Sequence, residues 1–141
     1  MRLGIVASRF NDEISGELLS RALAEAKRLG MAEPVVHSVP GALEIPLALQ
    51  WLAQSGRFDA LLAIGVVIRG ETYHFEVVSN ESARGVMDVS LEFGIPVANA
   101  ILTTEDEAQA QARLNKAAEA VQVAHEMFRL RETAQSVGKA S

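Results

Sequence analysis

The sequence contains no cysteine. Disulfide bonds, iron–sulfur clusters, thiolate zinc sites and a cysteine nucleophile are therefore excluded. Its three histidines, His37, His74 and His125, are too widely spread to predict a cluster of metal ligands. We therefore expect no metal site.

The chain also lacks a long apolar run and an excess of positive charge. No stretch reaches about 18 consecutive apolar residues, so we expect no membrane span. Thirteen basic and eighteen acidic residues give a net charge of −5, which argues against nucleic acid or an anionic membrane as partner. Met1 and Arg2 lead directly into an apolar run and leave no room for a signal peptide, so we expect a cytoplasmic protein.

No repeat, low-complexity segment or linker interrupts the 141 residues. This length is typical of one domain, which we expect to span residues 1–141. Hydrophobic residues make up 49% of the chain and charged residues 22%, which is ordinary for a globular protein.

Short continuous apolar runs alternate along the chain with segments of helical spacing. The order βαβαβαβα predicts an α/β fold, with a four-stranded parallel sheet between two layers of helices. Asn11 and Asp12 are candidate caps for the first helix, and Thr104 with Glu107 has capping-box spacing for the last. A disordered tail is expected from about residue 134. The expected strands are 3–7, 34–39, 60–68 and 96–102, and the expected helices are 12–29, 42–53, 74–93 and 105–133.

Four loops follow the carboxyl ends of these strands, where parallel α/β proteins bind their ligands. His74 lies after the third strand and is the strongest catalytic candidate, because an imidazole can donate and accept a proton around neutral pH. The alternative is a solvated histidine at a helix end. His37 and His125 are interpreted as structural.

Other side chains near these loops each have two interpretations. Residues 70–72 either present backbone N–H groups to an anion or form an ordinary turn. Phe10 either stacks on a flat ring or covers the core. Glu44 either favours the helix dipole or accepts hydrogen bonds from a ligand. Arg113 and Lys116 either bind phosphate or are solvated helix residues.

Four ordered motifs at these loops are more specific together than any one alone. They read GIVASRFN (4–11), VPGALEIP (39–46), IGVVIRGETYHFE (64–76) and ILTTEDEAQAQAR (101–113). From Leu3 to about Leu130 the chain resembles the lumazine synthase family.

The resemblance implies a flavodoxin-like, three-layer α/β/α sandwich and a transferase of riboflavin biosynthesis. The implied reaction condenses 5-amino-6-(D-ribitylamino)uracil with 3,4-dihydroxy-2-butanone 4-phosphate. Its products are 6,7-dimethyl-8-ribityllumazine, phosphate and water. The resemblance implies no metal or organic cofactor.

The resemblance also implies a role for each matching position. His74 is the expected proton-transfer residue, and Phe10 stacks on the pyrimidine ring. Arg113 neutralises the phosphate in a site shared with a neighbouring subunit, with Lys116 as a further candidate, and Asn99 contacts substrate from that neighbour. The other implied substrate-binding residues are Ala42, Leu43 and Glu44 beside the ribityl chain, Val66, Val67 and Ile68 at the pyrimidine, and Glu71 and Thr72 at the phosphate.

Three of these positions depart from the family pattern. Leu43 stands where the family often has an aromatic residue, Val66 replaces a common threonine, and Asn99 stands where many members have phenylalanine. Family members form pentamers or shells of twelve pentamers, and for this chain we expect the pentamer, with riboflavin synthase as a partner. The alternative function is a non-catalytic paralogue that binds a flavin or lumazine.

Overall fold

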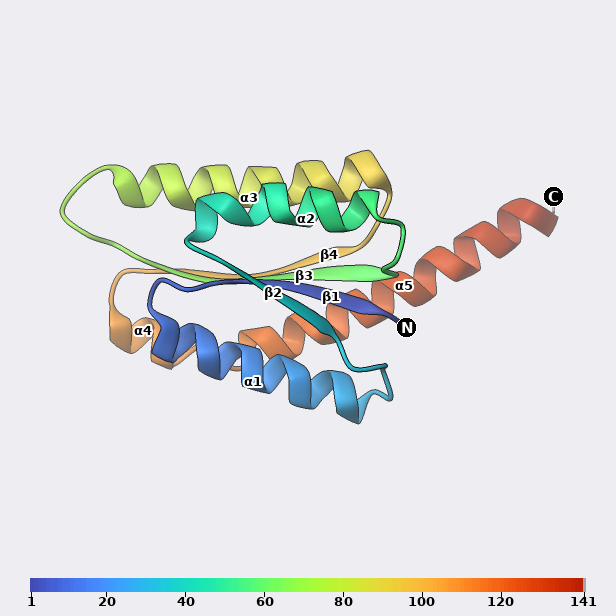
Figure 1. Ribbon diagram of the computed structural model, residues 1–141, viewed down its shortest axis with the longest axis horizontal. Coiled ribbons are helices and arrows are strands. Elements are labelled where there is room, and N and C mark those ends of the chain that lie inside the picture. Colours follow the sequence, from blue (N-terminus) through green and yellow to red (C-terminus); the bar gives the residue numbers. More distant parts are fainter. Residues whose placement is uncertain (141) are drawn as a thin grey trace.

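A four-stranded parallel sheet lies at the centre of the computed structural model, which describes residues 1–140 and side chains through residue 136 (Figure 1). The elements in chain order are β1 (Leu3–Ser8), α1 (Asp12–Arg28), β2 (Val35–Val39), the 3-10 helix η1 (Ala42–Glu44), α2 (Ile45–Gln54), β3 (Ala60–Ile68), α3 (His74–Phe93), β4 (Val97–Thr104), α4 (Glu107–Gln111) and α5 (Lys116–Ala140). The strand order is β2-β1-β3-β4.

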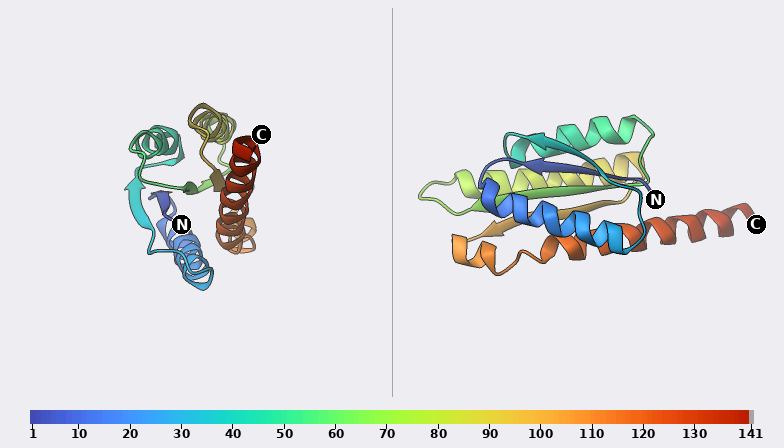
Figure 2. Two further views of the ribbon diagram at one scale, coloured as in Figure 1. Left: turned by 90° about the vertical axis from the view of Figure 1, so that its right-hand side faces the viewer. Right: turned by 60° about the horizontal axis from the view of Figure 1, so that its bottom comes forward.

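Each face of the sheet is covered by a pair of helices. Helices α1 and α5 pack on one face, and α2 and α3 on the other (Figures 1 and 2). Successive residues of β3 alternate between the two cores, as Leu61 and Leu62 do. A strand buried on both faces must be apolar throughout, which explains its continuous hydrophobic run. The predicted sandwich of helices around a four-stranded parallel sheet is confirmed.

The register of the strands brings the predicted ligand loops to one end of the molecule. Ser8 pairs with Val39 at the end of β1 and β2, whereas β3 and β4 continue together to the pair Ile68–Thr104. Figure 1 shows the loop after β3, the start of α2 and α4 at this end of the sheet. Among the described residues, no helix is both long and apolar enough to cross a membrane.

The start of α1 differs from the predicted side-chain cap. Asn11 adopts a left-handed conformation, with φ of 58°, and its side chain makes no cap. Its Nδ2 instead donates across the sheet end to the carbonyl oxygen of Val66, at 3.3 Å. Asparagine tolerates this backbone conformation better than most residues, so the chain can turn sharply into the helix.

The last predicted helix is broken in two, and the predicted capping box is wrong. Asp106 caps α4, because its Oδ1 accepts from the N–H of Gln109 at 2.8 Å. Residues 112–115 form turns with i→i−3 bonds, and the Arg113 Nη1 donates to the Gln109 carbonyl oxygen at 2.9 Å. No glycine or proline marks this break.

The second part of this segment, α5, runs to Ala140 rather than ending near Thr133. Ser141 lies outside the described residues. Disorder of the tail stays a prediction.

Candidate functional site

A hollow of about 250 Å³ opens at the carboxyl end of the sheet. The loop after β1, the turn into η1, the end of β3 and the first turns of α3 form its walls. Its lining residues are Phe10, Asn11, Gly41, Ala42, Leu43, Glu44, Val66, Val67, Ile68, His74 and Val78. Eight of them are residues that the sequence predicts as catalytic or substrate-binding.

Phe10 presents an aromatic ring to this hollow rather than to the core. Its side chain is 66% exposed, although its backbone N–H is held by the carbonyl oxygen of Pro40 at 3.3 Å. The ring lies against the backbone of Gly41. Of the two interpretations of Phe10, core cover does not fit this exposure, and stacking on a flat ligand stays a prediction.

Glu44 is positioned by the turn that precedes it. Its Oε1 accepts from the N–H of Gly41 at 3.1 Å, which fixes the carboxylate at the edge of the hollow. Its second oxygen has no hydrogen-bond partner among the described residues. A carboxylate held in this way can accept from the hydroxyl groups of a ligand.

The end of β3 has one unpaired edge. Pairing with β1 stops at Ile64, whereas pairing with β4 continues to Ile68. The backbone groups of this segment that point toward β1 therefore lie beside no strand, and among them the carbonyl oxygen of Val66 accepts from Nδ2 of Asn11. Such groups bind the polar edge of a flat heterocycle with defined spacing.

His74 is the first residue of α3, and its exposed side chain lines the hollow. Its backbone N–H donates to Oγ1 of Thr72 at 3.4 Å, which connects the helix start to the preceding loop. Val78 lies one turn further along the same helix face. The imidazole is accessible and can exchange protons with a bound ligand.

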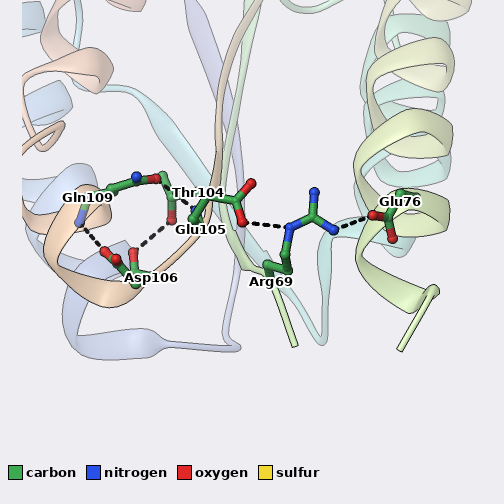
Figure 3. A network of polar contacts seen from close by, with 6 residues as sticks. All are labelled: Arg69, Glu76, Thr104, Glu105, Asp106 and Gln109. Atoms are coloured by element: carbon green, nitrogen blue, oxygen red, sulfur yellow. Dashed lines mark hydrogen bonds and ion pairs between the residues drawn. The ribbon is translucent and has the colours of Figure 1, made fainter. Parts of the chain in front are cut away.

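The hollow itself has no positive side chain, because none of its lining residues is lysine or arginine. Behind the loop after β3, Arg69 pairs with Glu76 and Glu105 (Figure 3). The hydrogen bond to Glu76, followed by that to Glu105, raises the pKa of Arg69, and the guanidinium holds the pKa of Glu76 below its ordinary range. The described residues contain no group of three or more His, Asp or Glu side chains suited to a metal ion.

Comparison with known proteins identifies the family of this chain. The model of the 6,7-dimethyl-8-ribityllumazine synthase family matches residues 1–132. This chain belongs to the lumazine synthase family. Membership assigns it lumazine synthase activity in riboflavin biosynthesis, which confirms the resemblance seen in the four motifs.

Individual relatives with the same description agree along most of their length. The protein of Nitrosomonas europaea is 60% identical over 131 residues, which cover 91% of this chain and 80% of the relative. The protein of Burkholderia multivorans is 56% identical over 133 residues, covering 92% and 77%. The protein of Paraburkholderia phytofirmans is 52% identical over 141 residues, covering 98% and 84%.

Five predicted site residues of this lumazine synthase family member lie outside the hollow. Glu71 and Thr72 are in the exposed loop between β3 and α3. Arg113 and Lys116 line a second hollow of about 440 Å³ beside β4. Asn99 is exposed on β4, where its Oδ1 accepts from the N–H of Ile101 at 2.8 Å.

Three lining residues were not predicted from the sequence. The sequence predicts Asn11 only as a helix cap, and its contact with the end of β3 accompanies a left-handed backbone conformation. Gly41 precedes η1 and makes room for an aromatic ring. Val78 had a usable signal, because it lies four residues after His74 on a predicted helix and so shares its face.

Proposed function

We propose that this protein condenses 5-amino-6-(D-ribitylamino)uracil with 3,4-dihydroxy-2-butanone 4-phosphate at the hollow lined by Phe10 and His74. The products are 6,7-dimethyl-8-ribityllumazine, phosphate and water. The observation that carries the proposal is that an aromatic ring, a fixed carboxylate, an unpaired strand end and an imidazole share one hollow in a member of this family.

The aminouracil occupies the hollow itself. Its flat ring stacks on Phe10, and its polar edge meets the backbone at the end of β3, at Val66, Val67 and Ile68. The ribityl hydroxyl groups lie along the turn into α2, where Glu44 accepts hydrogen bonds. Ala42 and Leu43 form the wall of this part of the site.

The phosphate of the second substrate binds at the loop after β3. The N–H groups of Glu71 and Thr72 have no hydrogen-bond partner among the described residues and are free to donate to an anion. The hydroxyl of Thr72 adds a donor. Positive charge comes from Arg113 and Lys116 of a second copy of the chain, because one chain holds them in a separate hollow.

The condensation proceeds by steps that each move a proton. The amine attacks the ketone to form an imine with loss of water, phosphate leaves by elimination, and the ring closes with loss of water. His74 accepts and donates the protons around neutral pH. Holding the two substrates in register lowers the activation barrier by up to roughly 7–11 kcal/mol. This is a larger effect on the rate than the about 10²–10⁴-fold acceleration typical of acid–base catalysis.

A shared site requires an assembly, and the pentamer is the smallest that the family resemblance offers. In this assembly, Arg113, Lys116 and Asn99 of one subunit lie beside the hollow of its neighbour. Large apolar side chains on α2 and α3, among them Leu47, Trp51 and Leu91, are exposed in the single chain and are available for burial between subunits. Analytical ultracentrifugation distinguishes a pentamer from a shell of twelve pentamers. Repeating the measurement with riboflavin synthase added tests that protein as a partner.

The reaction is tested by mixing the purified protein with both substrates and omitting each in turn. Phosphate release and lumazine absorbance should rise together, above the uncatalysed background, when both substrates are present. Tight binding of lumazine without phosphate release would instead support the non-catalytic paralogue.

A further inference from the structure

The side chain of Arg69 joins the first turn of α3 to the connection between β4 and α4. Its Nε donates to Oε2 of Glu105 at 2.6 Å, and its Nη1 donates to Oε1 of Glu76. Its guanidinium carbon lies 4.4 Å from the centroid of the Phe75 ring. Figure 3 shows the guanidinium between the two carboxylates. These contacts hold the first turn of α3 at a fixed distance from the connection between β4 and α4.

Arg84 shows what an ordinary surface arginine does in this protein. It also contacts two carboxylates, Glu81 at 3.1 Å and Asp88 at 2.8 Å, but all three residues lie on α3. Ion pairs within one exposed helix add little to stability and constrain no other element. The partners of Arg69 are 7 and 36 residues away, so its pairs constrain tertiary geometry.

The loop at residues 70–73 is tied at both ends through Arg69. The backbone N–H of Arg69 donates to the carbonyl oxygen of Thr104 at 2.9 Å, and its side chain reaches Glu76 just beyond the loop. Between these ties, the N–H groups of residues 70–72 make no hydrogen bond within the described chain. The direction in which they point therefore depends on the ends that Arg69 fixes.

The same side chain is connected to Arg113 through the other carboxylate. The backbone N–H of Glu105 donates to Oε1 of Gln109 at 2.8 Å. The carbonyl oxygen of Gln109 in turn accepts from Nη1 of Arg113 at 2.9 Å. A continuous series of hydrogen bonds thus runs from Arg69 to the guanidinium proposed to meet phosphate.

We infer that Arg69 is a positioning residue for phosphate recognition, which holds the anion-binding loop at 70–73 and the segment carrying Arg113 in their working orientation. This inference rests on the proposed function. Arg69 does not itself line the hollow that holds the aminouracil. Its loss should therefore affect one substrate and not the other.

The test compares Arg69→Gln and Arg69→Lys with the matched surface control Arg84→Gln, each as the assembled protein. In Arg69→Gln, we expect the KM for the butanone phosphate to rise about tenfold, within the roughly hundredfold that a 1 Å misplacement costs. The KM for the aminouracil should change less than about twofold. Arg69→Lys should recover only part of the loss. It keeps the positive charge, but an ammonium is a point charge that cannot bridge two carboxylates as a planar guanidinium does. Arg84→Gln should match the wild type.

A binding measurement separates this inference from the proposed function. Binding of inorganic phosphate, followed by isothermal titration, should weaken in Arg69→Gln whether or not the wild type turns over. An inactive wild type would refute the proposed function, while the phosphate titration would still decide the role of Arg69. If Arg69→Gln fails to fold by circular dichroism, Glu105→Gln removes one tie and should give a smaller rise in the same KM. Unchanged phosphate affinity in a folded variant, equal rises in both KM values, or an equal loss in Arg84→Gln would overturn the inference.

Discussion

The ring of Phe10 lies so close to Gly41 that a side chain at position 41 has no room. A Cβ built on Gly41 would be 2.8 Å from both Cδ2 and Cε2 of the ring. The backbone at Gly41 is extended, with φ of −144°, so space rather than conformation calls for glycine. The aromatic ring of Phe10 therefore packs against the turn into η1.

Gly41→Ala should displace this ring and weaken aminouracil binding. Stacking of a base on an aromatic side chain is worth about 1–3 kcal/mol, so we expect the KM for the aminouracil to rise about tenfold. Steady-state kinetics with each substrate varied in turn measures the change. The control is Gly16→Ala, since a Cβ on Gly16 meets nothing within 4 Å. An unchanged KM in Gly41→Ala would show that Phe10 does not stack on the substrate.

His74→Ala should slow turnover without abolishing it. Acid–base catalysis contributes about 10²–10⁴-fold, whereas substrate positioning contributes more and survives the substitution. The rate of lumazine formation should stay above the uncatalysed rate measured under the same conditions. His37→Ala, on the exposed edge strand β2, is the matched control. Complete loss of activity in a folded variant that still binds both substrates would contradict this account.

Arg113→Ala should act on the phosphate substrate. Charge-assisted hydrogen bonds to phosphate are among the stronger polar contacts, so we expect about a tenfold or greater rise in the KM for the butanone phosphate. Initial rates at varied butanone phosphate measure it. Arg129→Ala removes an exposed arginine that lines a different hollow, with Met1 and His125, and should change neither KM. The same KM in Arg113→Ala and wild type would remove Arg113 from the site.

The Arg69–Glu76 pair should make a pH-dependent contribution to stability. The folded pKa of Glu76 is lowered by the hydrogen bond from Arg69, so the pair stabilises the fold above the unfolded pKa of about 4.3 and loses this effect as pH falls through the folded pKa. The Tm difference between wild type and Glu76→Gln should therefore be largest near pH 7 and shrink at about pH 3. Thermal unfolding followed across this range tests it. A difference that stays constant with pH would assign the effect to packing.

Gly85→Ala should destabilise the layer formed by α2 and α3. A Cβ on Gly85 would be 2.6 Å from both Cβ and Cγ of Pro46, so the two helices must separate. Overpacking of this kind costs about 1–3 kcal/mol, against a gain of about 0.5–1 kcal/mol from removing a helical glycine. Denaturant unfolding should show a net loss, whereas Gly16→Ala, with free space in α1, should show the gain alone. Equal gains in both variants would mean that the helices adjust freely.

Much of the site was predictable because parallel strands bring their carboxyl ends together. The continuous apolar runs around Ile5 and Ile64 predict buried strands, and alternation with helices predicts their common direction. The loops beginning near Phe10 and His74 must then share one end of the sheet. Eight predicted residues share one hollow for this reason.

The break between α4 and α5 was not predictable from spacing. Ala110, Leu114, Ala117 and Val121 follow one another at helical intervals, so the pattern indicates a single helix. In the structure Asp106 caps the start of α4, and at the break the Arg113 side chain donates to the backbone carbonyl oxygen of Gln109. A pattern of apolar residues contains no information about such side-chain contacts.

The sequence by itself determined the order of strands and helices along the chain, the apolar segments that form the core and the motifs that identify the family. It did so because burial and helical or strand periodicity are local properties of the chain. Only the tertiary structure decided that Phe10 rests on Gly41, that Asn11 reaches Val66, and that Arg69 joins Glu76 to Glu105. These contacts join residues as far as 55 positions apart, so they depend on how the sheet aligns the ends of its strands and not on local sequence.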